Sequence, residues 1–305
     1  MRIHASGLTK EFGGRPAVDG LSFTVEPGRV TGFLGPNGAG KSTTLQLMLG
    51  LVGGGGRTLF DGRPYRDLAS PVREVGAVLD ARSFHPRRSA RDHLRMLAAA
   101  GGRGRVPDRR VGQVLDQVGL AGVADRPAGG FSLGMGQRLG LAAALLGGPR
   151  ALLLDEPANG LDPHGVAWLR DLLRGFAAEG GTVLVSSHLL AEMQLLADHV
   201  VVIGRGRLLA DEPLDRLLGR SARQQVLVRS PDAGRLAELL GAMGAAVDRV
   251  GDELTVSGVG AGAVGDLAHR HRLRLHQLAT RTASLEAAFL GLTGGDVEYV
   301  AGRRP

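Results

Sequence analysis

The stretch from Gly35 to Thr43 constrains this chain more than any other. It reads Gly-Pro-Asn-Gly-Ala-Gly-Lys-Ser-Thr and fits the phosphate-binding loop pattern, in which a glycine is followed, after four residues, by Gly-Lys and then Ser or Thr. The apolar run Val30 to Leu34 predicts a buried strand before it, and Thr43 to Leu49 predicts a helix after it. Strand, loop and helix in this order are the context that the pattern requires.

The residues of this loop suit a nucleotide phosphate. We expect Gly35, Gly38 and Gly40 to allow backbone conformations that other residues avoid, so that N–H groups surround an anion. Lys41, one of only two lysines among 37 basic residues, is expected to contact the β- and γ-phosphates, and Ser42 to bind Mg²⁺. The expected nucleotide contacts are Gly35, Pro36, Asn37, Gly38, Ala39, Gly40, Lys41, Ser42 and Thr43.

Composition limits the other classes of protein. The 305 residues, 43% of them apolar, allow one large domain and a smaller one. No apolar run reaches the roughly 18 residues of a membrane-spanning helix, and we find no leader, so a transport role would require membrane segments on another polypeptide. The arginines are scattered and only 4% of residues are aromatic. The net charge of +7 therefore does not predict a nucleic-acid partner.

Two further candidate sites follow apolar runs that predict strands. Ala151 to Leu154 leads directly into Asp155 and Glu156, and carboxylates there are costly unless they face a site. Asp155 is the natural Mg²⁺ partner of a phosphate loop, and Glu156 is placed to orient or deprotonate a water. The strand Thr182 to His188 ends in a histidine that we expect beside the acidic pair as a γ-phosphate contact. A solvated turn and a structural histidine are the alternative interpretations.

Weaker signals lie elsewhere in the chain. Phe12 offers an aromatic face for a nucleotide base, although a lone aromatic residue is more often part of a core. Ser132 is an expected helix N-cap whose hydroxyl and free N–H groups can face a ligand, but alone it indicates only a helix start. Gly53 to Gly56 predicts a flexible connection. Helical periods over about residues 83–144 predict an inserted helical lobe.

Alternating apolar strands and helices predict an α/β fold with a mostly parallel sheet covered by helices. After about residue 212 the pattern changes to that of a small α+β domain, 213–305. Its expected strands are Gln225 to Arg229, Glu253 to Ser257 and Leu273 to Leu278, with helices near Ala233 to Met243 and Val264 to Arg270.

Together, and in this order, the motifs resemble the ATP-binding cassette (ABC) family over about residues 1–212. The resemblance implies a P-loop NTPase with a RecA-like core, an N-terminal antiparallel β subdomain and a helical insert at about 83–144. It assigns adenine stacking to Phe12, the Walker A loop to Gly35–Thr43, the signature to Ser132–Met135, the Walker B aspartate and catalytic glutamate to Asp155 and Glu156, the D-loop to Asn159–Asp162 and the switch histidine to His188.

Three residues depart from the family pattern. Asp80 stands where the family has Gln or Glu, and a shorter carboxylate is expected to reach Mg²⁺ only through water. Leu133 replaces a signature glycine and Met135 replaces the glutamine. A side chain at Leu133 can restrict the approach of the backbone to a phosphate, so we expect a working ATPase whose turnover these departures can lower.

The resemblance also implies partners and a place in the cell. Two such domains meet head to tail as a homodimer, with Ser132 and Gly134 of one subunit closing over the ATP that Lys41 of the other binds. The chain is similar to the daunorubicin-resistance and multidrug exporter subgroup, which implies a separate membrane permease, the cytoplasmic face of the membrane and a regulatory or dimerising tail. The alternatives are a soluble cassette ATPase acting on ribosomes or DNA, and a nucleotide-binding module with little turnover.

Overall fold

The computed structural model describes residues 1–80, 83–100, 106–221, 225–281 and 284–293. These residues form two compact units. The first is Met1–Leu214, to which Leu292 and Thr293 also belong, and the second is Asp215–Gly291. The tail domain was predicted over 213–305, and its last part, 294–305, lies outside the described residues.

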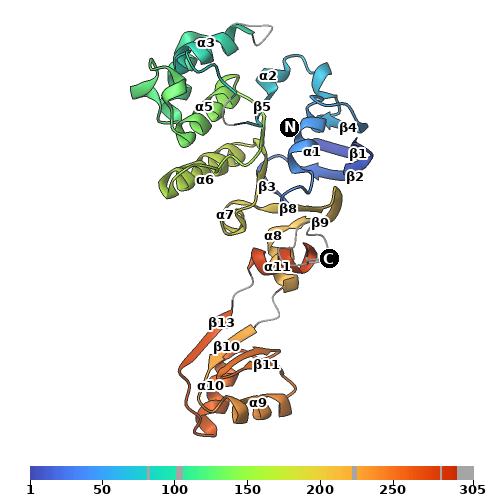
Figure 1. Ribbon diagram of the computed structural model, residues 1–305, viewed down its shortest axis with the longest axis vertical. Helices are drawn as coiled ribbons and strands as arrows, with labels where there is room; N and C mark the ends of the chain where they lie inside the picture. Colours follow the sequence, from blue (N-terminus) through green and yellow to red (C-terminus); the bar gives the residue numbers. More distant parts are fainter. Residues whose placement is uncertain (81–82, 101–105, 222–224, 282–283, 294–305) are drawn as a thin grey trace. The chain divides into compact units, whose positions relative to one another are not determined.

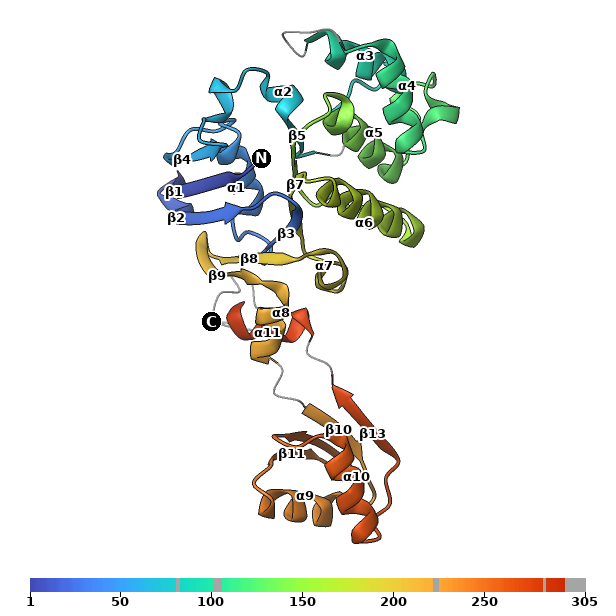
Figure 2. The ribbon, with the colours of Figure 1, turned by 180° about the vertical axis from the view of Figure 1, so that it is seen from behind.

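A six-stranded sheet forms the centre of the first unit, in the order β5-β6-β7-β3-β8-β9. All of its strands run parallel except β9, which is antiparallel to β8. Because α1 and α6 lie on opposite sides of it (Figures 1 and 2), its central strands are mostly buried and carry mainly apolar residues. The α/β fold of a P-loop NTPase is thereby confirmed. The strands are β3 (Arg29–Leu34), β5 (Val75–Val78), β6 (Ala151–Leu154), β7 (Thr182–Ser187), β8 (His199–Gly204) and β9 (Arg207–Pro213).

Of the four helices that the structure describes beside this sheet, α6 begins with a side-chain cap. Asp162 caps α6 by accepting a hydrogen bond from the Gly165 N–H at 2.7 Å, and Pro163 occupies the first turn, a position where its missing N–H costs nothing. The helices are α1 (Lys41–Met48), α2 (Pro71–Glu74), α6 (Pro163–Ala178) and α7 (Leu190–Leu196).

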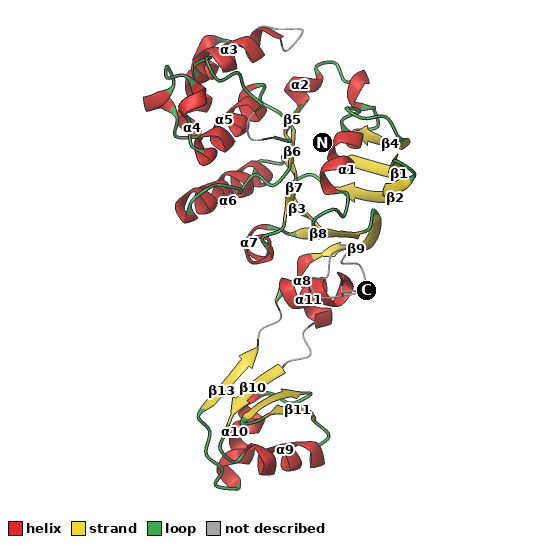
Figure 3. Ribbon diagram, viewed as in Figure 1, coloured by secondary structure: helices red, strands yellow, loops and turns green. Residues whose placement is uncertain are grey.

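An antiparallel sheet of β1 (Ile3–Phe12), β2 (Arg15–Val25) and β4 (Gly55–Phe60) completes the core, as Figure 3 shows. The prediction of a flexible connection is wrong for Gly55 and Gly56, which begin β4. Gly56 has φ +78°, and a Cβ there would lie 2.3 Å from the Gly7 carbonyl oxygen. Glycine is therefore required for β1 and β4 to approach each other.

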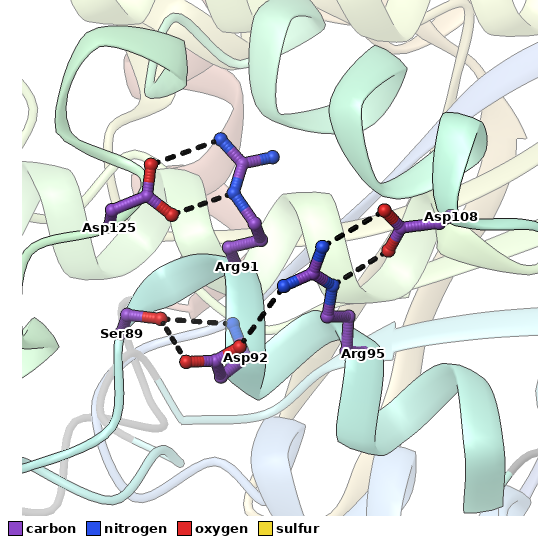
Figure 4. A network of polar contacts seen from close by, with 6 residues as sticks. All are labelled: Ser89, Arg91, Asp92, Arg95, Asp108 and Asp125. Carbon is purple, nitrogen blue, oxygen red and sulfur yellow. Dashed lines mark hydrogen bonds and ion pairs between the residues drawn. The ribbon is translucent and has the colours of Figure 1, made fainter.

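The predicted helical lobe consists of α3 (Ala90–Ala100), α4 (Asp108–Gln117) and α5 (Leu133–Leu146). Two paired ionic contacts join its parts on the surface (Figure 4). Arg95 makes two hydrogen bonds to the Asp108 carboxylate, at 2.7 and 2.9 Å, and Arg91 makes two to Asp125, at 2.7 and 3.3 Å. Both arginines are on α3, so this helix is fastened to the start of α4 and to the loop that follows it.

Replacing Asp108 with asparagine is expected to lower the melting temperature by about 1–3 °C at low salt, because exposed ion pairs stabilise weakly. The difference should shrink in 1 M NaCl, where charges are screened. Differential scanning calorimetry of Asp108→Asn beside Asp116→Asn, on the exposed side of the same helix, measures it. A decrease in melting temperature that is equal at both salt concentrations would contradict an ionic origin of the stabilisation.

Between α8 and α11, the second unit follows the order strand, helix, strand, strand, helix, strand, with strands arranged β11-β12-β10-β13. This is a ferredoxin-like arrangement and an α+β fold. The predicted strand at Leu273–Leu278 is wrong, because Leu273 and Leu275 pack on the core from a loop. The elements are α8 (Leu214–Ser221), β10 (Gln225–Arg229), α9 (Ala233–Ala242), β11 (Ala246–Val250), β12 (Glu253–Ser257), α10 (Ala261–Arg270), β13 (Gln277–Arg281) and α11 (Leu285–Thr293).

Candidate active site

The candidate site lies at one edge of the central sheet, where three neighbouring strands end. The phosphate loop follows β3, the acidic pair follows β6 and His188 follows β7, and β7 lies between the other two strands. Because these strands are parallel, their carboxyl ends meet at the same edge, which is where open α/β sheets bind ligands. Motifs far apart in the sequence are brought together here by strand order alone.

Glycine serves two different purposes in the phosphate loop. Gly40 caps α1 at φ +100°, and a Cβ there would lie 2.2 Å from the Ala17 carbonyl oxygen. Gly38 also has a positive φ, of +82°. Gly35 does not have a positive φ, so the prediction that it adopts a conformation other residues avoid is wrong. A Cβ on Gly35 would instead lie 2.7 Å from the Ile203 carbonyl oxygen, so close packing against β8 requires glycine there.

Lys41 is buried at the start of α1 and points back into the loop. Its ammonium donates to the Gly35 carbonyl oxygen at 2.7 Å and lies 3.8 Å from a carboxylate oxygen of Glu156. Burial lowers the pKa of the Lys41 ammonium, while the carboxylates of Glu156 and Asp155 oppose that shift. Phosphate oxygens can replace these internal partners and favour the charged ammonium in the same way.

The acidic pair is held by a buried serine. The Ser186 hydroxyl donates to a carboxylate oxygen of Asp155 at 2.5 Å and accepts a hydrogen bond from the Glu156 N–H at 2.9 Å. Glu156 has φ +47°, which is unfavourable for a residue with a Cβ by roughly 1–2 kcal/mol. A non-glycine residue in this region is typical of functional sites, where the surrounding structure enforces the conformation.

His188, which directly follows β7, is the third member of this charged group. Its Nδ1 lies 2.7 Å from Glu156 Oε2, and its backbone N–H donates to the same oxygen at 3.3 Å. The Glu156 carboxylate therefore lies between Lys41 and His188. The histidine ring is about half exposed, so it can contact both this carboxylate and a ligand in the solvent.

Other predicted site residues lie outside this charged group. Phe12 is exposed at the end of β1, with the Lys10 ammonium 4.9 Å from its ring centre. Asp80 is exposed after β5, and Ser42 is exposed in the first turn of α1. Ser132 caps α5 by accepting the Met135 N–H at 3.2 Å.

The signature segment contacts the D-loop of its own chain. A Cβ on Gly134 would lie 2.8 Å from the Gly160 carbonyl oxygen, and one on Gly160 would lie 2.3 Å from a Leu133 methyl carbon. Leu133, which departs from the family pattern, thus covers Gly160, whose φ is +78°. Glycine at both Gly134 and Gly160 allows the two segments to pack.

Sequence reasoning missed Ser186 and Gln137. Ser186 is fully buried near the end of β7, and Gln137 donates from α5 to the Glu156 carbonyl oxygen at 3.1 Å. Both are buried polar residues in mostly apolar elements. Because buried polar groups need partners, that pattern was the signal that could have found them.

Comparisons with known proteins place the chain in a family. The ABC transporter family matches residues 18–159, and a domain of unknown function (DUF8746) matches residues 224–286. The chain is 34% identical over 302 residues to the uncharacterized ABC transporter ATP-binding protein YhcH of Bacillus subtilis (strain 168), covering 98% of each. It is 39% identical over 224 residues to the bacitracin transport ATP-binding protein BcrA of Bacillus licheniformis, covering 72% of each.

A solved structure supports the same assignment. The ATP-binding subunit of an ABC transporter superimposes with a TM-score of 0.65 at 27% identity, covering 72% of this chain and 93% of the other. The chain belongs to the ATP-binding proteins of the ABC transporter family. It binds ATP and is an ATPase.

Replacing Ser186 with alanine should lower the free energy of unfolding by about 1–3 kcal/mol, because the buried N–H of Glu156 loses its acceptor. It should also reduce ATPase turnover by about tenfold, since both acidic residues lose a fixed contact. Urea unfolding and steady-state ATPase assays measure the two effects. Ser187→Ala, which removes an acceptor of the Leu189 N–H, is the control, and equal turnover in both variants would contradict a role for Ser186.

Proposed function

We propose that this chain is the motor subunit of an ABC exporter, which uses ATP binding and hydrolysis to drive efflux through a separate membrane permease. The observation that carries the proposal is the Glu156 carboxylate, which lies between Lys41 of the phosphate loop and His188 of the neighbouring strand. It supports the proposal because a carboxylate can accept a proton, and we expect the γ-phosphate to bind beside it.

The proposed nucleotide contacts are the phosphate loop, with its backbone N–H groups and Lys41, and the exposed ring of Phe12 for the base. Ser42 and Asp155 are oxygen donors of the kind that Mg²⁺ prefers, and they follow β3 and β6 at the same edge of the sheet. Asp80 is proposed to approach the metal through water. Mg²⁺ would supply charge neutralisation on the phosphates.

Within the chain, Glu156 would accept a proton from the attacking water, and His188 would fix the carboxylate and contact the γ-phosphate. The 2.7 Å contact between His188 and Glu156 restrains the carboxylate before nucleotide binds. Its other oxygen faces Lys41, so binding of phosphate to Lys41 frees that oxygen for water. Nucleotide binding and activation of the base are coupled through one side chain.

A dimer would complete the site. Ser132 is exposed at the start of α5, and Gly134 lies in the first turn of that helix. Helix N-termini with free N–H groups suit a phosphate. We propose that these residues close over the ATP bound to Lys41 of a second copy. ATP would then hold two copies together and hydrolysis would release them, giving a two-state element for a membrane partner.

The export role rests on the relatives. The chain resembles a bacitracin transport ATP-binding protein over its cassette, which supports a drug, antibiotic or lipid-like substrate. None of the described helices is long and apolar enough to cross a bilayer. We therefore propose a peripheral position at the cytoplasmic face of the membrane, bound to a separate permease, with regulation or dimer contact as the role of the tail.

The alternatives receive less support. A cassette ATPase acting on ribosomes or DNA is not favoured, because the relatives described above are named as transporter proteins. A regulatory module with little turnover is not favoured either, because Lys41, Glu156 and His188 form a contiguous group suited to hydrolysis.

Glu156→Gln is expected to preserve ATP binding, to lower turnover by at least roughly 10²–10⁴-fold through loss of the general base, and to trap a dimer. An ATPase assay and gel filtration in Mg·ATP measure these effects, with the exposed Glu179→Gln as the control. Turnover that is unchanged in Glu156→Gln would refute the assigned base.

Lys41→Ala should instead weaken nucleotide binding itself, by about 10- to 100-fold, because a charge-assisted contact to phosphate is worth roughly 1.5–3 kcal/mol. Equilibrium binding of a fluorescent ATP analogue measures it. The exposed Arg66→Ala variant is the control for loss of one positive charge, and an ATP affinity equal to that of the wild type would exclude the assigned contact.

A further inference from the structure

Gln137 lies in the second turn of α5, only 3% exposed. Its side-chain Nε2 donates to the backbone carbonyl oxygen of Glu156 at 3.1 Å. That carbonyl also accepts the Asn159 N–H at 3.1 Å. The contact therefore reaches the backbone of Glu156 itself, whose side chain contacts Lys41 and His188.

The backbone of Glu156 needs such support. Its φ of +47° is a conformation that residues with a Cβ leave when nothing enforces it. Ser186 holds the N–H on one side of the residue and Gln137 holds the carbonyl on the other. One support comes from β7 and the other from α5, so the direction of the Glu156 side chain depends on both elements.

Stability alone does not account for this glutamine. Its Oε1 is buried without a hydrogen-bond partner among the described residues, and an unpaired buried acceptor is unfavourable by about 1–3 kcal/mol. Most of the other buried residues of α5 are Leu and Ala, and an apolar side chain at Gln137 would avoid that loss. The amide is present in spite of an energetic disadvantage, which points to its hydrogen bond with the Glu156 carbonyl oxygen.

We propose that Gln137 is a positioning residue that holds the backbone of Glu156, in the same chain, in the conformation that hydrolysis requires. The first turn of α5 supports this assignment, because Leu133 and Gly134 pack on Gly160 of the segment that follows Glu156. The start of α5 thus has two roles. Ser132 faces a second copy under the proposed function, while Gln137 acts on its own chain.

The first test uses the nucleotide-free protein, so that it does not depend on the proposed function. Gln137→Met keeps the side-chain volume but removes the donor, and hydrogen exchange at the backbone amides of Glu156 and of residues 158–161 should become about tenfold faster. Gln113→Met, on the exposed part of α4, is the control and should leave the exchange rates unchanged. Unchanged rates in Gln137→Met would overturn the proposal. Gln137→Leu, which also lacks a donor, replaces Gln137→Met if that variant does not fold.

The second test separates catalysis from nucleotide binding. Gln137→Met should lower kcat roughly 10- to 100-fold through misplacement of Glu156, while the affinity for a fluorescent ATP analogue stays within about twofold. A lower affinity with unchanged kcat would overturn the proposal. A wild-type protein without ATPase activity would instead refute the proposed function, and the exchange measurement would still decide the role of Gln137.

Mixed dimers decide whether Gln137 acts within its own chain. When Gln137→Met and Glu156→Gln are on the same subunit, opposite a wild-type one, only one site is damaged and activity should match that of a Glu156→Gln/wild-type dimer. When the two substitutions are on different subunits, both sites are damaged and activity should be lower, by about the kcat loss of Gln137→Met. The opposite ranking would overturn the proposal.

Discussion

The carboxylate of Glu156 joins the parts of the site. One oxygen faces the Lys41 ammonium at 3.8 Å and the other contacts His188 at 2.7 Å, so a single side chain links the ends of three strands. Without nucleotide, this carboxylate balances the charge of a buried lysine, whose pKa burial lowers. Phosphate would replace it there. The Glu156 carboxylate can thus balance the charge of Lys41 before nucleotide binds and accept a proton after it binds.

The rest of the structure fixes that carboxylate in place. The parallel sheet sets the strand ends side by side, and Ser186 and Gln137 hold the two peptide groups of Glu156 from different elements. Catalytic groups require such rigid support, because small displacements lower the rate steeply. Ser132 is the N-cap of the same helix, α5, so under the proposed function a motion of the helical lobe would change the direction of Glu156.

The sequence predicted the sheet and its site because several independent signals agree there. The apolar run Ala151–Leu154 became β6 with the predicted bounds, since a strand buried on both faces favours a continuous apolar run. The strand β11 was missed because it is an edge strand, mostly exposed, with little apolar pattern. Gln137 and Ser186 were missed because a motif describes ligand contacts, whereas these residues act through tertiary hydrogen bonds that only the fold creates.

We propose that phosphate replaces the internal partners of Lys41 in a site shared by two copies. A crystal structure of the Glu156→Gln protein with Mg·ATP tests this most directly. We expect the Lys41 ammonium to leave the Gly35 carbonyl for the β- and γ-phosphates, and Ser132 of a second copy to face the same nucleotide. A nucleotide bound by one chain alone, with Lys41 still on Gly35, would contradict the account.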